Sequence, residues 1–462
     1  MKSFGLFLSL FFISLNFSFS QLRVAPDTYV IRFKDKANSS YSIEKPLDFL
    51  SERAIYRRQK YNIPITEQDI PVNKTYVDSI KHLGFDIYGT SKWLNCAIVH
   101  TQDSTLIGKI KYLAFVDTSK IVKKEKAKYK VPAPEKITVE SKADTFFTYD
   151  YGYGKNQVRI MNLHNLHNKG FTGKGIQIAI LDAGFKNVDR LKGFDSLRTN
   201  HQILGIKDFV ERDTDVYRDA THGMQVLSTI AANYPEKLVG TAPDAKFWLL
   251  HTENEHSENL VEEYYWVLGA EFADSVGADI IHSSLGYNNF DDTLVSYKYE
   301  DMNGDIAPAS VASDIASSKG ILCVTSAGNE GDAPWRYITS PADADSCLTV
   351  GAVSGENLIA NFSSVGPTPD GRIKPEVVAQ GAFVWVLLPK RGVTFSFGTS
   401  FSGPIIAGAV ACLWQAHPEC TNMEIIDAVI KSADKYQKPD DEYGYGLPDF
   451  NKADLYLKMK GK

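Results

Sequence analysis

The chain has 462 residues, of which 44% are hydrophobic, and it carries a formal net charge of −6 at pH 7. This length exceeds one small domain and suits two or three domains, each able to bury a core. The slightly acidic balance gives no reason to expect nucleic acid or an anionic membrane as a partner. The five cysteines lie far apart without a CxxC pair, which argues against a zinc site or a disulfide-dense scaffold.

The first residues have the pattern of a secretory signal peptide. Lys2 supplies a positive charge, an apolar run covers residues 4–19, and Ser18 and Ser20 are small. We therefore expect residues 1–20 to be removed, although an N-terminal membrane anchor is the alternative. Serine and asparagine interrupt the run, which favours the signal peptide. Because no later segment reaches membrane-spanning length without charges, we expect a secreted or periplasmic protein with no membrane span in its mature chain.

Residues 21–120 are predicted to form a small α+β unit. Its expected elements are strands at residues 28–33 and 93–99 and helices at residues 47–60 and 74–83. The next stretch, residues 121–148, is rich in lysine, glutamate and proline. It is either a basic binding patch or a solvated linker open to proteolysis, and we favour the linker.

After residue 149 the pattern changes to short apolar runs that alternate with helical stretches. The expected strands are residues 176–181, 247–250, 279–282, 321–325 and 348–350, and the clearest helices are residues 262–276 and 310–318. This alternation predicts an α/β domain over residues 149–462, with a doubly wound, mostly parallel sheet. Functional groups in such sheets gather at the carboxyl ends of the strands, where Asp182 lies.

Gly398-Thr399-Ser400 leads into a run of small apolar residues that is typical of a buried helix. Ser400 is therefore expected at the helix N-terminus, where the macrodipole and free N–H groups favour developing negative charge. Pro404 is tolerated if it occupies an early helical position that needs no donor. Such a serine suits nucleophilic acyl transfer, although it could also serve merely as a helix cap.

His222 begins a second helical stretch, so aspartate, histidine and serine follow one another at the edges of three elements that face one rim. In such a set the histidine takes the serine proton and the aspartate holds the imidazole in the useful tautomer. Asn329 follows another apolar strand in a glycine-rich turn, where its amide could donate to an oxyanion. The segment Ser284-Leu285-Gly286 has little bulk at a strand end, which suits backbone pairing with an extended peptide.

Taken in order, these motifs resemble those of the subtilisin-like serine proteases over roughly residues 151–455. The match depends on the following segments: Asp182-Ala183-Gly184, His222-Gly223, Ser284-Leu285-Gly286, Ala327-Gly328-Asn329, Lys374 to Ala379, and Gly398-Thr399-Ser400 with Pro404. Four positions depart from the family pattern without removing a reacting group: Ala183, Met224, Phe401 and Ser402. They affect specificity more than activity.

The resemblance implies a secreted serine endopeptidase of the bacterial type. Ser400 would be the nucleophile, His222 the general base and then acid, and Asp182 its orienting partner. Asn329 and the Ser400 N–H would form the oxyanion hole. The substrate cleft would be lined by Ser284, Leu285 and Gly286, with Ala327 and Gly328 beside the primary specificity pocket.

The family resemblance also bears on partners and cofactors. The substrates would be polypeptides, and residues 21–120 would be an inhibitory, chaperone-like prodomain that acts within its own chain. No cofactor is required, and structural calcium is possible although the sequence identifies no calcium site.

Several other readings compete with this one. An α/β-hydrolase esterase would need a Gly-x-Ser-x-Gly elbow and the order serine, acid, histidine, and neither is present. A catalytically silent binding protein is disfavoured by the intact reacting residues. The glycines of residues 170–175 precede a strand instead of following it, which excludes a nucleotide-binding loop.

Three further pairs of histidines or cysteines need comment. His164 and His167 could suggest a metal site, but surface histidines are the favoured interpretation. Cys323 and Cys347 are expected in the core, whereas a disulfide between residues 412 and 420 stays undecided.

Overall fold

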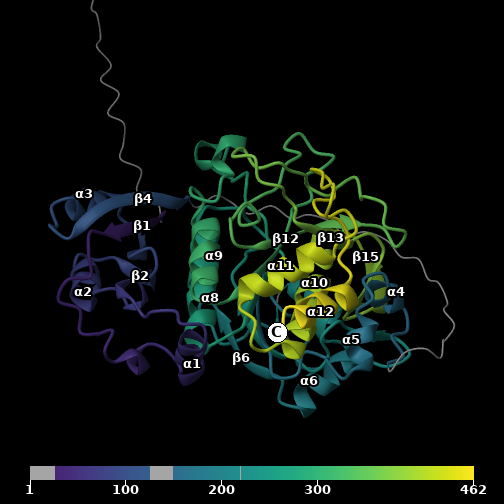
Figure 1. Cartoon of the computed structure of the whole chain (residues 1–462). Coiled ribbons are helices and arrows are strands. Elements are labelled where there is room, and N and C mark those ends of the chain that lie inside the picture. The colour runs from purple at the N-terminus through teal and green to yellow at the C-terminus, as the bar shows by residue number, and fades with distance from the viewer. Residues whose placement is uncertain (1–26, 125–148, 219) are drawn as a thin grey trace, which may run out of the picture.

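The computed structural model describes residues 27–124, 149–218 and 220–462. Figure 1 shows a small N-terminal unit, coloured purple to blue, beside a larger unit that contains the rest of the described chain. The expected signal peptide lies outside the described residues. Strand β4 (Val116–Lys124) contains the first four residues of the expected linker, and residues 125–148 of that linker also lie outside the description.

The N-terminal unit is a four-stranded antiparallel sheet in the order β2-β3-β1-β4. The other strands are β1 (Asp27–Phe33), β2 (Asp86–Ser91) and β3 (Cys96–Thr101), and the helices are α1 (Glu52–Lys60), α2 (Lys74–His82) and α3 (Ile107–Ile110), with 3-10 turns at Pro46–Asp48, Glu67–Asp69 and Ser104–Leu106. The expected helix over residues 47–60 is divided at Ser51, whose side chain caps α1 by accepting from the Ala54 N–H. The α+β prediction for this unit is therefore confirmed.

The larger unit contains a seven-stranded sheet in the order β13-β12-β11-β10-β5-β9-β6, with every pair of neighbours parallel. Its strands are β5 (Gln177–Asp182), β6 (Ile203–Asp208), β9 (Lys246–His251), β10 (Ile280–Ser283), β11 (Leu322–Ser326), β12 (Leu348–Val353) and β13 (Val377–Gln380). All five strands expected from the sequence are present, and β6 and β13 add the two edges. The doubly wound α/β prediction is confirmed.

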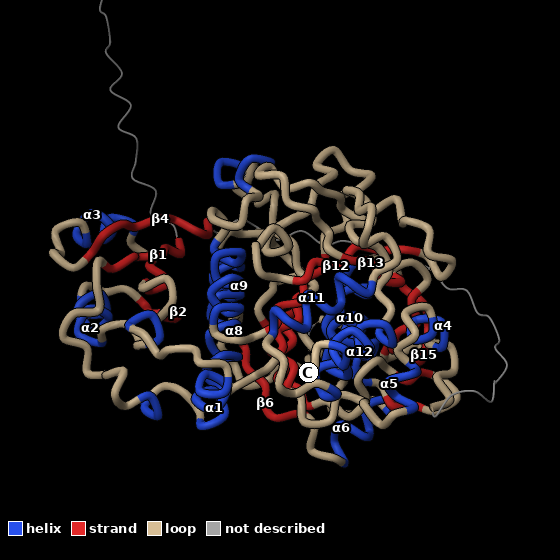
Figure 2. The backbone as a smooth tube through the Cα atoms, viewed as in Figure 1, coloured by secondary structure: helices blue, strands red, loops and turns tan. Residues whose placement is uncertain are grey.

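Helices cover both faces of this sheet, as Figure 2 shows with the red strands between blue helices. On one face Ile178 and Ile180 of β5 join a core with α7 (His222–Ala231) and α10 (Thr399–Ala416). On the other face Ala179 and Leu181 join a core with α8 (Val261–Val276) and α9 (Pro308–Ser318). Alternate residues of one strand thus serve opposite cores, as the two-residue repeat of a strand requires.

Shorter elements complete the larger unit. They are helices α4 (Lys155–Arg159), α5 (His164–Asn168), α6 (Asp195–Thr199), α11 (Asn422–Ser432) and α12 (Phe450–Met459), the hairpins β7 (Asn233–Tyr234) with β8 (Leu238–Val239) and β14 (Val384–Leu388) with β15 (Gly392–Ser396), and 3-10 turns at Lys192–Phe194, Thr293–Val295 and Tyr299–Asp301. Within the described part of the chain, no helix is long and apolar enough to cross a membrane.

The two units meet across a buried cluster of charges centred on Asp274, a fully buried residue of α8. Its carboxylate accepts from Arg57 at 2.7 Å, from Arg58 at 3.1 and 3.2 Å, and from Lys92 at 3.3 Å, all three being residues of the N-terminal unit. Asp69 provides a second acceptor for Arg58 at 2.6 Å. Burial raises the pKa of Asp274, but these three cations outweigh burial and hold that pKa well below its ordinary value.

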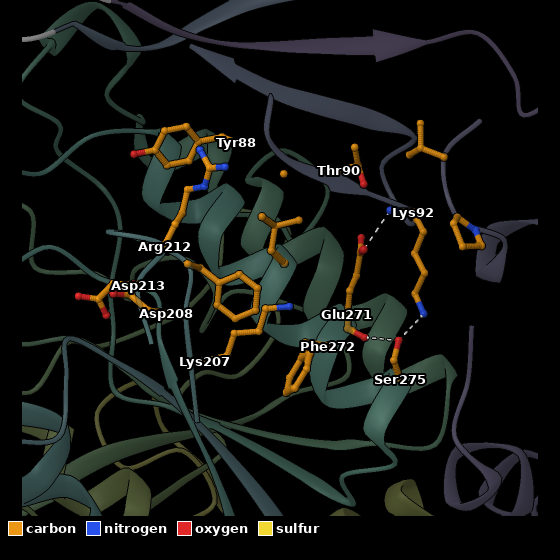
Figure 3. A pocket seen from close by; sticks show the side chains of 15 residues that line it. Tyr88, Thr90, Lys92, Lys207, Asp208, Arg212, Asp213, Glu271, Phe272 and Ser275 are labelled. Carbon is orange, nitrogen blue, oxygen red and sulfur yellow. Dashed lines mark hydrogen bonds between the residues drawn. The ribbon is translucent and has the colours of Figure 1, made fainter. Parts of the chain in front are cut away.

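A pocket of about 540 Å³ lies at the same junction, between α8 and the N-terminal unit. Figure 3 shows the Glu271 carboxylate of α8 accepting from the Lys92 N–H at 2.9 Å, with the Lys92 side chain reaching Ser275 at 3.0 Å. The Glu271 carboxylate also accepts from the Ser91 hydroxyl and the Trp93 N–H. A carboxylate of the larger unit thus caps the β2–β3 turn of the smaller one, which fixes how the two units pack.

Two expectations about single residues need comment here. His167 is buried, so the prediction of a surface position was wrong for this histidine. Its Nδ1 atom lies 2.5 Å from the Tyr151 hydroxyl oxygen, and its Nε2 atom lies 3.0 Å from the Thr241 carbonyl oxygen. Burial lowers its pKa to about 4. Cys323 and Cys347 are buried as expected, and the undecided cysteines at 412 and 420 are buried free thiols.

Candidate active site

Asp182 and His222 meet at the carboxyl end of β5. Asp182 is the last residue of the strand and is fully buried, whereas the His222 side chain, at the first position of α7, is 29% exposed. The His222 Nδ1 atom lies 2.7 Å from Asp182 Oδ1. A carboxylate only accepts, so Nδ1 carries the hydrogen and Nε2 presents a lone pair. This tautomer is the one that a general base needs.

Glycines on both elements allow this close approach. Gly184 has φ +129°, a conformation that residues with a side chain rarely adopt. A Cβ atom at Gly223 would lie 2.6 Å from the Gly184 carbonyl and 2.9 Å from the Asp182 Cβ. Helix α7 can therefore begin directly against the strand end. The Asp182 carboxylate also accepts from the Ala183 N–H at 2.7 Å, which fixes its orientation.

The electrostatic environment favours a basic imidazole. Burial alone would lower the pKa of His222, but the charge of Asp182 and its hydrogen bond outweigh burial and raise that pKa above its ordinary value. Glu255 and Glu253 act in the same direction from the chain that follows β9. His222 thus lies in a negative field that stabilises the imidazolium formed when it takes a proton.

Ser400 is the second residue of α10 and is buried, with 8% of its surface exposed. Its hydroxyl donates to the Ser284 carbonyl at 3.4 Å. Between the described residues no hydrogen bond joins His222 to Ser400. The His222 ring nevertheless lies beside the start of α10, because its centroid is 6.0 Å from that of Phe401. The structure therefore brings Asp182 and His222 into direct contact. Ser400 immediately precedes Phe401, whose ring packs beside the His222 ring.

Pro404 is the sixth residue of α10, so it lies inside the helix and not in the first turn as expected. A residue at this position would donate its N–H to the Ser400 carbonyl, and proline has no such donor. The Ser284 hydroxyl replaces it, because its Oγ donates to the Ser400 carbonyl at 2.9 Å. The proline is tolerated because the Ser284 side chain, directly after β10, supplies the missing hydrogen bond.

Asn329 lies beside the same helix N-terminus. Its Oδ1 accepts from the Thr399 N–H at 2.8 Å and from the Thr399 hydroxyl at 3.0 Å. Because both bonds hold the amide oxygen, the Nδ2 hydrogens are directed elsewhere, and the side chain is exposed. An exposed amide donor thus stands next to the N–H of Ser400, which has no intrahelical acceptor at the second helical position.

The expected cleft residues follow β10 and β11. Ser284 and Leu285 are nearly buried, and Gly286 is exposed. A Cβ atom at Gly286 would lie 2.4 Å from the Thr339 hydroxyl oxygen, so a side chain there would displace the neighbouring segment. Ala327 is fully buried.

Gly328, the next residue, has φ +111°. A Cβ atom there would lie 2.7 Å from the Ser364 hydroxyl oxygen, so backbone conformation and space both call for glycine.

Two residues of this region were not predicted from the sequence. Thr399 orients Asn329, and His282 of β10 lies under α10 with its Nε2 2.8 Å from the Ser284 hydroxyl oxygen. His282 stands within an apolar strand, a pattern that gives no signal of a functional role. Among the described residues, no group of three or more histidine, cysteine, aspartate or glutamate side chains is placed to hold a metal ion.

Comparison with known proteins identifies two family models that match the chain. A family model described as "Subtilase family" matches residues 173–446, which include every site residue named above. A second model, "Peptidase S8 propeptide domain, Bacteroidota", matches residues 28–137 and therefore covers the N-terminal unit.

Individual relatives match about three fifths of the chain. Subtilisin NAT of Bacillus subtilis subsp. natto is 31% identical over 299 residues, 64% of this chain and 69% of the relative. Subtilisin of Bacillus pumilus has the same identity over the same length, which is 95% of that relative. Serine protease AprX of Bacillus subtilis is 29% identical over 306 residues, 60% of this chain and 65% of the relative.

Proposed function

This chain belongs to the subtilase family of serine-type endopeptidases, and we propose that it cleaves peptide bonds through an acyl-enzyme formed on Ser400. The observation that carries the proposal is the 2.7 Å bond from His222 to a fully buried Asp182 beside the start of α10. This bond fixes the tautomer in which Nε2 can accept the Ser400 proton.

The reaction begins when the Ser400 hydroxyl turns from the Ser284 carbonyl to His222 Nε2. As Ser400 Oγ attacks the scissile carbonyl carbon, His222 takes the hydroxyl proton and Asp182 stabilises the imidazolium. The oxygen of the tetrahedral intermediate accepts from Asn329 Nδ2 and from the Ser400 N–H, at the positive end of α10. His222 then protonates the leaving amine, and water repeats the sequence to release the acid.

We propose that the substrate binds as an extended strand along Ser284, Leu285 and Gly286. Gly286 is exposed and has no side chain, so a peptide backbone can approach it closely. The wall formed by Ala327 and Gly328 would border the side chain that precedes the scissile bond. Support for this assignment comes from their position after β11, next to Asn329.

The N-terminal unit is a propeptide domain, and we propose that it inhibits its own chain until the segment after Lys124 is cut. The buried charges between Asp274 and the unit would keep it bound to the larger unit before the cut. We further propose that the protein is secreted, on the basis of the signal-peptide pattern in residues 1–20. Mass spectrometry of the exported protein should give a chain that begins after Lys124, and a sole product beginning near residue 21 would contradict processing.

Labelling with a serine-directed peptidyl phosphonate tests the proposed nucleophile. We expect one phosphonate on each mature chain, located on the peptide that contains Ser400, and no label on Ser400→Ala. A folded protein that neither reacts with the phosphonate nor cleaves a peptide library would instead be a silent binding protein.

A further inference from the structure

A chain of buried hydrogen bonds runs beneath the nucleophile from β11 to α10. His282 Nδ1 lies 3.0 Å from the Val324 carbonyl, and His282 Nε2 lies 2.8 Å from the Ser284 hydroxyl oxygen. The same Ser284 oxygen lies 2.9 Å from the Ser400 carbonyl. His282 is fully buried and Ser284 nearly so, so water does not complete these contacts for the imidazole.

Ser284 contacts Ser400 at two points. Its hydroxyl reaches the Ser400 carbonyl, and its own carbonyl accepts from the Ser400 hydroxyl at 3.4 Å. The first contact replaces the N–H that Pro404 lacks. The direction of the Ser284 hydroxyl therefore bears on how the nucleophilic residue is held.

Counting hydrogens shows that this chain of bonds is one hydrogen short. The Val324 carbonyl only accepts, so His282 Nδ1 carries a hydrogen and the Nε2 of a neutral ring has none. Both Nε2 and the Ser400 carbonyl are then acceptors for the single Ser284 hydrogen. Nothing nearby relieves the competition, because the Ser326 hydroxyl donates to the Thr399 carbonyl at 2.8 Å and lies 3.5 Å from Ser284 Oγ.

We propose that His282 is a positioning residue for the nucleophile: its Nε2 atom holds the Ser284 oxygen in place beneath the Ser400 carbonyl by sharing the Ser284 hydrogen with that carbonyl. This inference rests on the proposed function, since it assigns Ser400 as the nucleophile. Helix α10 is packed directly on the ring: a Cβ atom at Gly403 would lie 3.0 Å from His282 Cε1. The ring therefore contacts both the underside of α10 and the Ser284 side chain.

The surroundings keep His282 neutral at the pH where a protease of this type works. Burial lowers its pKa to about 4, and His222 acts in the same direction, whereas Asp182 and the Val324 carbonyl act against it. The other groups that face it are the hydroxyls of Ser284 and Ser326. A neutral ring therefore shares the Ser284 hydrogen with the Ser400 carbonyl, and without a polar group at position 282 the Ser284 side chain is free to turn away from Ser400.

Three single variants and one double variant test this role of His282, and each is measured as kcat per phosphonate-labelled site so that unfolded protein does not count. His282→Leu and Ser284→Ala should each lower kcat about tenfold, the scale of one lost hydrogen bond, with KM changed less than about twofold. The double variant should lose no more than the worse single one, since both remove the same contact. His282→Gln, whose amide N–H can donate to Ser284 Oγ, should retain kcat within about threefold.

Ser283→Ala is the matched control on the same strand. The Ser283 hydroxyl accepts from Trp266 Nε1 at 2.9 Å on the opposite face of the sheet, so its loss should lower the melting temperature and leave kcat unchanged. Three results would each overturn the proposed role of His282. They are an unchanged kcat in Ser284→Ala, losses in the two single variants that multiply in the double variant, and a His282→Gln variant as slow as His282→Leu. If His282→Leu does not fold, the kcat values of Ser284→Ala and His282→Gln are sufficient to test the proposal. A parent chain that takes no phosphonate would instead contradict the proposed nucleophile.

Discussion

Replacing the buried carboxylate of Asp274 should separate the two units more than any change to an exposed ion pair. Asp274→Asn keeps the shape of the side chain but leaves Arg57 and Lys92 buried without their ion-pair partner, while Arg58 keeps Asp69. Removing one partner of a buried pair costs about 3–5 kcal/mol, because the remaining charge stays desolvated. We therefore expect the free energy of unfolding to fall by about that amount.

The measurement is urea unfolding of the full chain in a Ser400→Ala background, which should remain uncut, followed by tryptophan fluorescence. Trp93 lies in the N-terminal unit next to Lys92, so its emission reports on separation of the units. Asp78→Asn is the control, since Asp78 pairs with Lys74 at the surface with side chains 43% and 75% exposed, and its loss should leave stability unchanged. Equal stability of Asp274→Asn and its parent would refute the reasoning.

The stabilising effect of the Asp274 carboxylate should also depend on pH. The folded pKa of Asp274 lies below its ordinary value of 3.8, so the carboxylate contributes stability above about pH 4 and loses it as pH falls further. The gap between parent and Asp274→Asn should therefore stay constant from pH 7 to pH 5 and narrow below pH 4. A gap that narrows between pH 7 and pH 5 would point to a different titrating group.

The remaining predictions concern the reacting groups. Ser400→Ala should lower kcat by about 10⁶-fold while its circular dichroism matches the parent, a magnitude taken from a subtilisin relative; substantial turnover would move the nucleophile elsewhere. Asn329→Ala should lower kcat by about 10²–10³-fold with KM unchanged, again the loss measured in a subtilisin; an unchanged kcat would remove Asn329 from the oxyanion role. Because the pKa of His222 is raised and its protonated form cannot act as base, kcat/KM should fall with decreasing pH around a midpoint above 6.5, and Asp182→Asn should shift that midpoint downward.

Sequence patterns predicted the middle of the large sheet and missed its edges. The runs that became β5, β9 and β11 are apolar because both of their faces are covered. Strand β6 is half-exposed and contains Gly205 and Lys207, so it lacks that signal. Strand β13 begins two residues after Pro375, and a proline marks turns and strand ends more often than strand interiors.

The contacts of buried polar groups were also not predictable from the sequence. Asp274 and Glu271 belong to a helix that was predicted from the sequence, but their burial was not predicted. Their partners Arg57, Arg58 and Lys92 lie more than 170 residues earlier in the chain. No local pattern connects residues so far apart, so the ion cluster emerges only when both units are folded. His167 is a similar case, because the Thr241 carbonyl that its ring contacts lies 74 residues later in the chain.

The serine motif does not predict which way the Ser400 hydroxyl points. The segment around Gly398 predicts a serine in the first turn of α10, but the hydroxyl direction depends on rotation about one side-chain bond. Its present contact, 3.4 Å to the Ser284 carbonyl, is long for a hydrogen bond between two oxygens and is easily exchanged. An extended peptide beside Gly286 would offer its own N–H groups to that carbonyl. Substrate binding would then occupy Ser284 and release the hydroxyl toward His222, so that the nucleophile and its base become aligned when a peptide is present.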